Sequence, residues 1–265
     1  MKAMILAAGL GTRLRPLTDN RPKALVELSG RTLLEITLSR LRAFAVTEVI
    51  VNVHHFADRV IDYLKSNNNS GMRIEISRED ILLDTGGGLK KAAWFFLEDS
   101  ARPDSKSGDS SRGDSKQFDE PFLLHNVDVI SNIDLRRMLQ FHKENRALAT
   151  LAVQSRETSR PLLFDEHFQL RGRRIDNKNT VISSEARNLS SIPLHALAFS
   201  GIHIISPRLL PMLTEEGAFS IIHSYLRLAS QGEKILAFRA DQYYWRDLGR
   251  PADLAQAALD LQQNA

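Results

Sequence analysis

The stretch AMILAAGLGTRLRPLTDNRPKAL, residues 3–25, indicates the class of fold. Its first six residues form a short apolar run that ends at Gly9, which predicts a buried β-strand followed by a turn. Gly9 and Gly11 are spaced like the first two glycines of the dinucleotide-binding fingerprint, which follows a strand of an α/β fold. The stretch therefore favours an α/β protein with a ligand-binding loop close to its N-terminus.

The rest of the chain also alternates short apolar runs with helix-like segments. Further strands are predicted at residues 48–53, 73–77, 122–128, 148–153, 196–205, 234–240 and 242–249. Helices are predicted at residues 32–44, 57–67, 88–97, 135–145, 219–230 and 251–263. This β-α-β-α order predicts a mostly parallel sheet with helices on both faces.

Composition and length exclude several classes of protein. The chain has 265 residues, 43% of them hydrophobic and 25% charged, and it contains no cysteine, which excludes disulfides and thiolate chemistry. The formal net charge of +3 is too small to favour nucleic acid as a partner. Neither a signal peptide nor a membrane helix is predicted, so a cytoplasmic location is expected. The sequence leaves the oligomeric state open.

Two polar segments interrupt the alternation of strands and helices. Residues 99–119 are rich in Ser, Asp, Gly and Lys, and residues 174–193 are polar without a clear period. Both are predicted to be flexible insertions. Because the sheet pattern resumes after each, we expect one domain over residues 1–265.

The glycine-rich loop matches neither common phosphate-binding motif. The dinucleotide fingerprint needs a third glycine where this chain has Leu14, and the sequence contains no P-loop motif. A glycine-rich turn remains, with Arg13 inside it and Lys23 behind a proline. Glycines let backbone N–H groups approach phosphates, the arginine fork binds two phosphate oxygens, and lysine supplies a point charge. The loop therefore favours a triphosphate ligand, and a solvated basic loop is the alternative.

The same residues resemble a known family. LAAGLGTRLRPLT followed by RPKAL is similar to the signature of the nucleotidyltransferases that make nucleoside-diphosphate sugars, and the resemblance extends along most of the chain. It is strongest to compact N-acetylmuramate-1-phosphate uridylyltransferases and mannose-1-phosphate guanylyltransferases. The resemblance implies a Rossmann-like three-layer sandwich with a mixed, mostly parallel central sheet. It also implies that an NTP and a sugar 1-phosphate are converted to an NDP-sugar and pyrophosphate.

The nucleotide is expected to contact two glycine-rich segments. In LLDTGGGLKKA, residues 82–92, three glycines allow close approach of a flat ligand, and a flexible turn is the alternative. Gly86 and Gly87 are the main candidates there, and Asp84 and Thr85 are weaker ones. The resemblance implies catalytic roles for Arg13 and Lys23. The full set of expected nucleotide-binding residues is Leu6, Ala8, Gly9, Gly11, Thr12, Gly86, Gly87 and Asn126.

Two aspartates are candidate ligands of Mg²⁺. Asp128 follows a predicted buried strand, where ligands of open α/β sheets gather, and Asp134 is better placed to cap the next helix. Asp247 lies in WRDLG, which matches a W-x-D-x-G pattern of the family. Mg²⁺ prefers carboxylate and phosphate oxygens, so these two residues are expected to hold it against the substrates. The family usually has glycine where this chain has Val127, and a side chain there narrows the pocket.

The sugar is expected to lie near Asn52, Gly201 and Trp245. Gly201 interrupts a predicted strand, where the family lets the sugar approach the backbone and where a β-bulge is the alternative. Arg160 and the arginines of residues 171–174 are candidates for binding the sugar phosphate. The sequence does not choose among them.

Other functions compete with nucleotidyl transfer. A non-catalytic nucleotide-sugar-binding relative should lack Arg13, Lys23 or one of the two aspartates, and all four are present. A nicotinamide dehydrogenase is excluded by Leu14 and by the missing acidic residue after the second strand. We therefore expect an enzyme, with uridylyl transfer favoured and guanylyl or thymidylyl transfer as alternatives.

Overall fold

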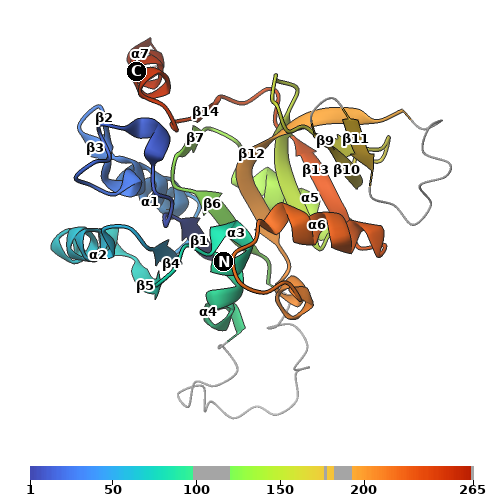
Figure 1. Cartoon of the computed structure of the whole chain (residues 1–265), viewed down its shortest axis with the longest axis horizontal. Coiled ribbons are helices and arrows are strands. Elements are labelled where there is room, and N and C mark those ends of the chain that lie inside the picture. Colours follow the sequence, from blue (N-terminus) through green and yellow to red (C-terminus); the bar gives the residue numbers. More distant parts are fainter. Residues whose placement is uncertain (98–119, 176–177, 182–192, 264–265) are drawn as a thin grey trace.

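The computed structural model describes residues 1–97, 120–175, 178–181 and 193–263, and Figure 1 shows their arrangement. The predicted insertion at residues 99–119 and most of the one at residues 174–193 lie outside the described residues. Within the second segment, residues 178–181 form a strand that pairs with the strand ending at Ile175. That part of the second predicted insertion is therefore regular structure and not a loop.

One large sheet runs through the molecule. Its strands are β1 (Lys2–Leu6), β4 (Glu48–Val53), β5 (Arg73–Arg78), β6 (Phe122–Asn126), β8 (Ala149–Gln154), β9 (Leu162–Phe164), β10 (Leu170–Ile175), β11 (Lys178–Val181), β12 (His195–Ile205) and β13 (Ile235–Arg239). The order is β11-β10-β9-β12-β6-β1-β4-β5, and β8 pairs with both β12 and β13. Strands β5, β4, β1 and β6 are parallel, whereas β12 runs antiparallel to β6. The predicted mixed α/β sheet is confirmed.

Helices lie on both faces of this sheet (Figure 1). They are α1 (Leu33–Ala43), α2 (Ala57–Ser66), α3 (Asp84–Lys91), α4 (Ala93–Leu97), α5 (Leu135–Asn145), α6 (Ile221–Ser230) and α7 (Pro251–Gln263). Local signals fix several helix starts. The Thr32 side chain accepts a hydrogen bond from the backbone N–H of Glu35, and Asp134 caps α5 through two N–H groups. Asp134 therefore takes the predicted capping role and leaves Asp128 available.

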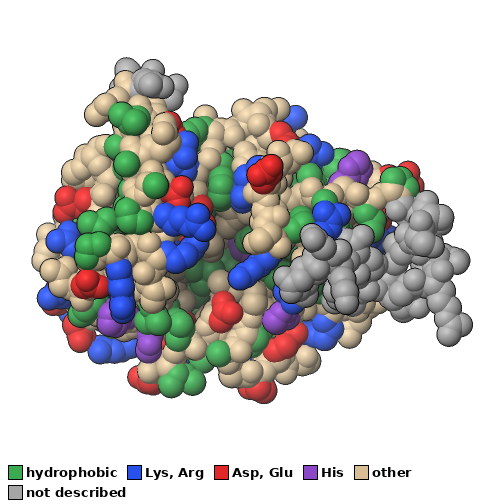
Figure 2. Space-filling view, turned by 45° about the horizontal axis from the view of Figure 1, so that its top comes forward, with side chains coloured by type: hydrophobic (Ala, Val, Ile, Leu, Met, Phe, Trp, Pro, Cys, Tyr) green, Lys and Arg blue, Asp and Glu red, His purple; other side chains and the backbone are tan. Residues whose placement is uncertain are grey.

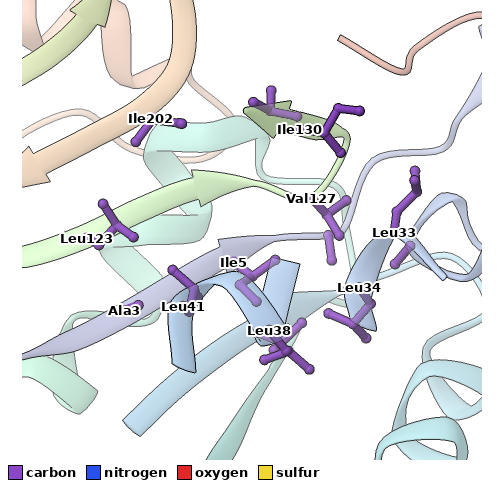
Figure 3. Packing of buried hydrophobic residues seen from close by; sticks show 14 of the residues in the cluster. Ala3, Ile5, Leu33, Leu34, Leu38, Leu41, Leu123, Val127, Ile130 and Ile202 are labelled. Atoms are coloured by element: carbon purple, nitrogen blue, oxygen red, sulfur yellow. The ribbon is translucent and has the colours of Figure 1, made fainter. Parts of the chain in front are cut away.

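The core consists of two apolar clusters, one on each face of the sheet. Alternate residues of β1 enter different clusters: Ala3 and Ile5 face α1, and Met4 faces the side of α3 and α6. Figure 3 shows the first cluster, in which Leu34 and Leu38 of α1 lie close to Ile5. Burial on both faces explains why the central strands read as continuous apolar runs.

Two short elements position the candidate site. Strand β7 (Val129–Ser131) pairs with β14 (Trp245–Asp247) as a separate antiparallel ribbon, so Asp247 lies opposite Val129. The sequence predicted a longer strand over residues 242–249 and did not predict β7. In β12 the register with β8 shifts between Phe199 and His203, around Gly201, whose φ is 73°. The β-bulge that was the alternative interpretation of Gly201 is present.

Further short elements follow β1 in the sequence. Strands β2 (Glu27–Leu28) and β3 (Arg31–Thr32) form a hairpin, and the 3₁₀ helices η1 (Thr12–Leu14) and η2 (Lys23–Leu25) shape the first loop.

Buried histidines should make folding sensitive to acid. Burial is the largest cause that lowers the pKa of His142 to about 4 and that of His203 to about 3, whereas both titrate near pH 6.5 when unfolded. Below that pH the unfolded chain binds more protons than the folded chain. The free energy of unfolding should therefore fall on acidification from pH 6.5 toward 4, by about 1.4 kcal/mol per pH unit for each histidine. Urea unfolding at pH 7, 6 and 5 measures this slope.

The His142→Gln variant is the matched comparison, because glutamine can keep polar contacts to Thr150 and Ser206 without titrating. Its slope should be smaller by about one histidine equivalent. An unchanged slope would show that His142 is not the acid-sensitive group.

Candidate active site

The first loop is shaped for close approach of a ligand to the backbone. Gly11 has a φ of 67°, and a Cβ atom there would lie 2.9 Å from Cγ2 of Thr18 and 3.2 Å from Cβ of Lys23. Among the described residues, none accepts a hydrogen bond from the backbone N–H of Gly9, Leu10 or Gly11. These donors are available for phosphate oxygens.

Lys23 and Asp128 form an ion pair at the centre of the site. Lys23 opens η2 directly after Pro22, and its Nζ donates to Oδ2 of Asp128. The two side chains are only 12% and 14% exposed. The predicted stiff segment therefore places the ammonium group next to the first candidate metal ligand.

Asp247 lies beside this pair. The backbone N–H of Leu248 donates to the carbonyl of Asp128 at 2.8 Å, which ties the two aspartate-bearing segments together. Burial and the nearby charge of Asp128 raise the pKa of the Asp247 carboxyl, while Lys23, the Gly249 N–H and Arg13 act in the opposite direction. Two partly buried carboxylates that repel each other form a site that a divalent cation would stabilise.

The donor set fits Mg²⁺ better than a closed structural metal site. Among the described residues there is no group of three or more His, Cys, Asp or Glu side chains that could hold an ion. Two carboxylates leave coordination positions open for substrate phosphates, as is usual for Mg²⁺. The residues present are therefore compatible with the predicted Mg²⁺, with Asp128 and Asp247 as its ligands.

Two cavities share Asn126 in their walls, and each is lined by some of these charged residues. The first, of about 380 Å³, is lined by Leu6, Ala8, Gly9, Lys23, Asn52, Glu79, Leu82, Asp84, Thr85, Asn126, Val127, Asp128 and Ala218. The second, of about 830 Å³, has a wall that includes Arg13, Asn126, Gly201, Trp245 and Asp247. Asn126 lines both cavities. Figure 2 shows a hollow near the middle of this face with Lys and Arg side chains around it.

The first cavity contains four of the expected nucleotide-binding residues, Leu6, Ala8, Gly9 and Asn126. Gly86 and Gly87 do not line it. They are buried in α3, where a Cβ on Gly86 would lie 2.3 Å from the Phe219 ring and one on Gly87 would lie 2.5 Å from the Gly217 carbonyl oxygen. These glycines therefore permit close packing of α3 and are not placed to contact a ligand. The weaker candidates, Asp84 and Thr85, line the cavity instead.

The other expected nucleotide-binding residues of the first loop are Gly11 and Thr12. Gly11 and Thr12 line neither cavity, and Gly11 is the residue before η1. The Gly11 carbonyl accepts hydrogen bonds from the N–H of Leu14 and the hydroxyl of Thr18. The Gly11 carbonyl therefore contributes to the shape of the loop.

Sequence reasoning missed Glu79. This buried carboxylate lines the first cavity, accepts from Nδ2 of Asn52 at 2.7 Å and accepts from the N–H of Leu83 at 3.0 Å. Asn52 in turn accepts from the N–H of Ala7 at 2.7 Å. The network joins the first loop to the segment before α3. Its only sequence signal is an acidic residue two positions after the predicted strand at residues 73–77.

The second cavity contains two of the three expected sugar-binding residues, Gly201 and Trp245. Asn52 is separated from them and belongs to the first cavity. Of the basic candidates, Arg160 and Arg173 line the second cavity, whereas Arg171 is paired with Asp165 at 2.7 Å. Arg156, which sequence reasoning did not single out, also lines it.

No helix among the described residues combines the length and apolar character that crossing a bilayer requires.

Comparisons with known proteins give the class to which the fold and site belong. Residues 2–162 match the model of the family described as nucleotidyl transferase. The chain belongs to this nucleotidyl transferase family.

Individual relatives agree with this class. Over 93 residues, or 34% of this chain and 38% of the relative, the sequence is 54% identical to N-acetylmuramate alpha-1-phosphate uridylyltransferase from Caulobacter vibrioides. Over 256 residues, or 96% of this chain and 62% of the relative, it is 30% identical to mannose-1-phosphate guanyltransferase beta-B from Xenopus laevis. The chain thus spans less than two thirds of the length of either relative.

A solved structure shows the same fold. The crystal structure of HddC from Yersinia pseudotuberculosis complexed with GMP-PN superposes with a TM-score of 0.70 at 20% identity. The superposition covers 98% of this chain and 99% of that one.

Proposed function

We propose that this chain transfers a nucleoside monophosphate from an NTP to a sugar 1-phosphate, giving an NDP-sugar and pyrophosphate. The observation that carries the proposal is a pair of cavities that share Asn126, with Lys23 and Asp128 in the wall of the first and Arg13 and Asp247 in the wall of the second. A nucleotide in the first cavity and a sugar phosphate in the second would bring their phosphates together at these charges. Such an arrangement suits an in-line attack on the α-phosphate without a covalent enzyme intermediate.

The main barrier to this reaction is the approach of two anions. Lys23, at the edge of the first cavity, stabilises charge at the α-phosphate, and the free N–H groups of the first loop hold the triphosphate. Arg13 holds the leaving pyrophosphate with its planar fork. Asp128 and Asp247 would hold Mg²⁺, which supplies charge neutralisation at the phosphate oxygens when bound.

The Glu79 carboxylate in the wall of the first cavity supports a nucleotide base with a ring N–H. Glu79 is a hydrogen-bond acceptor when ionised. Uracil, thymine and guanine present a ring N–H that can donate a hydrogen bond to a carboxylate. Adenine and cytosine present a ring nitrogen that is itself an acceptor at the corresponding edge. Uridylyl transfer is favoured among the three, because the relative with 54% identity over 93 residues is named as a uridylyltransferase.

The Glu79→Gln variant should weaken selection of the base. Glutamine presents an amide that can donate as well as accept, so the KM for UTP should rise about 10-fold while discrimination against CTP falls. Steady-state kinetics with UTP and CTP at a fixed acceptor concentration measure both. If the KM for UTP and the UTP preference are unchanged, Glu79 does not read the base.

The acceptor is proposed to be a sugar 1-phosphate of the hexosamine type, with N-acetylmuramate 1-phosphate as the first candidate. This choice rests on the same relative. A non-catalytic nucleotide-sugar-binding role remains the alternative, and it is disfavoured because Arg13, Lys23, Asp128 and Asp247 are all at the site.

A matrix of four nucleoside triphosphates against several sugar 1-phosphates tests the proposal. Pyrophosphate release that requires both substrates and Mg²⁺ is the expected result. Binding of nucleotide without any release would favour the non-catalytic role.

A further inference from the structure

Arg156 has an unusual position on the wall of the second cavity. Its guanidinium lies over the Trp245 ring, with the guanidinium carbon 3.8 Å from the ring centroid. One terminal nitrogen donates to the carbonyl of Phe199 at 2.6 Å, and Nε is buried without any hydrogen-bond partner. The nearby charge of Asp247 acts on the guanidinium, but among the described residues no carboxylate lies close enough to form an ion pair with it. A stacked, partly buried guanidinium thus keeps unused donors.

Burying a charged group without a partner anion is unfavourable, and a stacked arginine is well suited to bind a carboxylate or phosphate through its fork. The aromatic ring holds the guanidinium plane in one orientation. Trp245 is itself fixed, because its Nε1 donates to the carbonyl of Ser200 at 2.7 Å. Arg156 is therefore preorganised for an anion that enters the cavity.

The position of Trp245 separates this anion from the reacting phosphate. Trp245 and Asp247 are two residues apart on β14, so their side chains lie on one face about 7 Å apart along the strand. Gly201 of β12 lines the same cavity as Trp245 and Asp247, and a Cβ there would lie 2.9 Å from Nδ2 of Asn126, so glycine permits close packing at this point. A phosphate at Asp247 would therefore place the sugar ring near Gly201 and a ring substituent near Arg156.

The wall of the second cavity carries more arginines than the binding of one phosphate group requires. Arg246 is paired with Asp260, and Arg13 faces Asp247. Arg160, Arg173 and Arg250 also line the cavity and form no ion pair with a described residue. The other acidic lining residues are Glu157 and Asp253.

We propose that Arg156, held on Trp245, is a specificity-determining residue that binds a second anionic group, a carboxylate, on the acceptor sugar. The inference rests on the proposed function and names the residue that selects the acceptor. It assigns the phosphate to the charges around Asp247 and the carboxylate to Arg156.

Matched pairs of acceptors test this assignment. N-acetylmuramate 1-phosphate and N-acetylglucosamine 1-phosphate differ by a lactyl ether with its carboxylate, and glucuronic acid 1-phosphate and glucose 1-phosphate differ by oxidation at one carbon. The Arg156→Gln variant should lose about 10- to 100-fold in kcat/KM for the carboxylated member of a pair. Its kcat/KM for the neutral member should change less than about 3-fold.

Further variants separate charge from packing. Arg156→Lys keeps the charge without the fork and should lie between the wild type and Arg156→Gln for the carboxylated acceptor. Trp245→Leu removes the platform and should lower kcat/KM for the carboxylated acceptor at least as far as Arg156→Gln does. Arg137→Gln, on the exposed face of α5, is the control for loss of one arginine and should match the wild type with all acceptors.

The possible results distinguish the two proposals. Equal losses of kcat/KM with both members of a pair would show that Arg156 binds the phosphate, and no loss with either would show that it binds no anion; both overturn the inference while nucleotidyl transfer stands. Failure of the wild-type protein to transfer to any acceptor would overturn the proposed function and this inference with it.

Discussion

Replacing Lys23 with alanine should lower kcat by about 100- to 1,000-fold, because the variant removes the positive charge that we propose to stabilise the transferred phosphate. The same change leaves Asp128 without its ion-pair partner. The negative charge of Asp128 then repels Asp247 without the opposing charge of Lys23. The KM for the nucleotide should change much less, since the free N–H groups of the first loop remain. Steady-state kinetics with saturating acceptor measure both parameters.

Arg21→Ala is the matched control for Lys23→Ala. Arg21 is exposed in the same loop, two residues before Lys23, and lines neither of the two cavities of the site. Its removal should leave kcat within about 2-fold of the wild type. Unchanged turnover of a folded Lys23→Ala protein would remove Lys23 from the catalytic set.

The Gly86→Ala variant should lose stability and not primarily nucleotide affinity. A new Cβ would lie 2.3 Å from the Phe219 ring and 2.9 Å from the Phe219 carbonyl oxygen. Alanine is favoured over glycine by about 1 kcal/mol in a helix, but overpacking typically costs about 1–3 kcal/mol. The Phe219 carbonyl oxygen belongs to the backbone and cannot move aside as easily as a flexible side chain. We expect a net loss of about 2 kcal/mol in the free energy of unfolding, measured by urea titration.

Two further variants sharpen this test. Gly9→Ala is the control for stability, because nothing lies within 4 Å of a Cβ at that position. The double variant Gly86→Ala, Phe219→Ala should be less destabilised than the sum of its single variants, since removing the ring relieves the closest contact. Strict additivity, or a Gly86→Ala protein as stable as the wild type, would contradict the packing role of Gly86.

Regular elements of the central sheet could be predicted from the sequence. The predicted strand at residues 48–53 and the helix at 135–145 match β4 and α5 at both ends. Both carry strong local signals: a mostly apolar run, interrupted by Asn52, for β4, and an aspartate cap with helical apolar spacing for α5. Strand β7 lies between Asp128 and the α5 cap. It has only three residues, which is too short for such a pattern.

Residues of the candidate site could be predicted where they belong to a local sequence motif. Residues whose position depends on tertiary contacts were missed. Lys23 and Asp128 are 105 residues apart, yet each stands in a recognisable segment. The glycines of residues 86–88 have the composition of a ligand-binding turn, and the packing of Gly86 and Gly87 against residues 217–219 is visible only in three dimensions. Arg156 has no local signal, because its environment comes from Trp245 and Phe199 on other strands.

The most direct test of the central claim is the amount of NDP-sugar formed per pyrophosphate released. Wild-type protein with UTP, a sugar 1-phosphate and Mg²⁺ should give both products in a 1:1 ratio, determined by mass spectrometry and a pyrophosphate assay in the same reaction. The Asp128→Asn and Asp247→Asn variants should give neither at a comparable rate. Pyrophosphate release without NDP-sugar, or release that does not require the sugar 1-phosphate, would contradict the account.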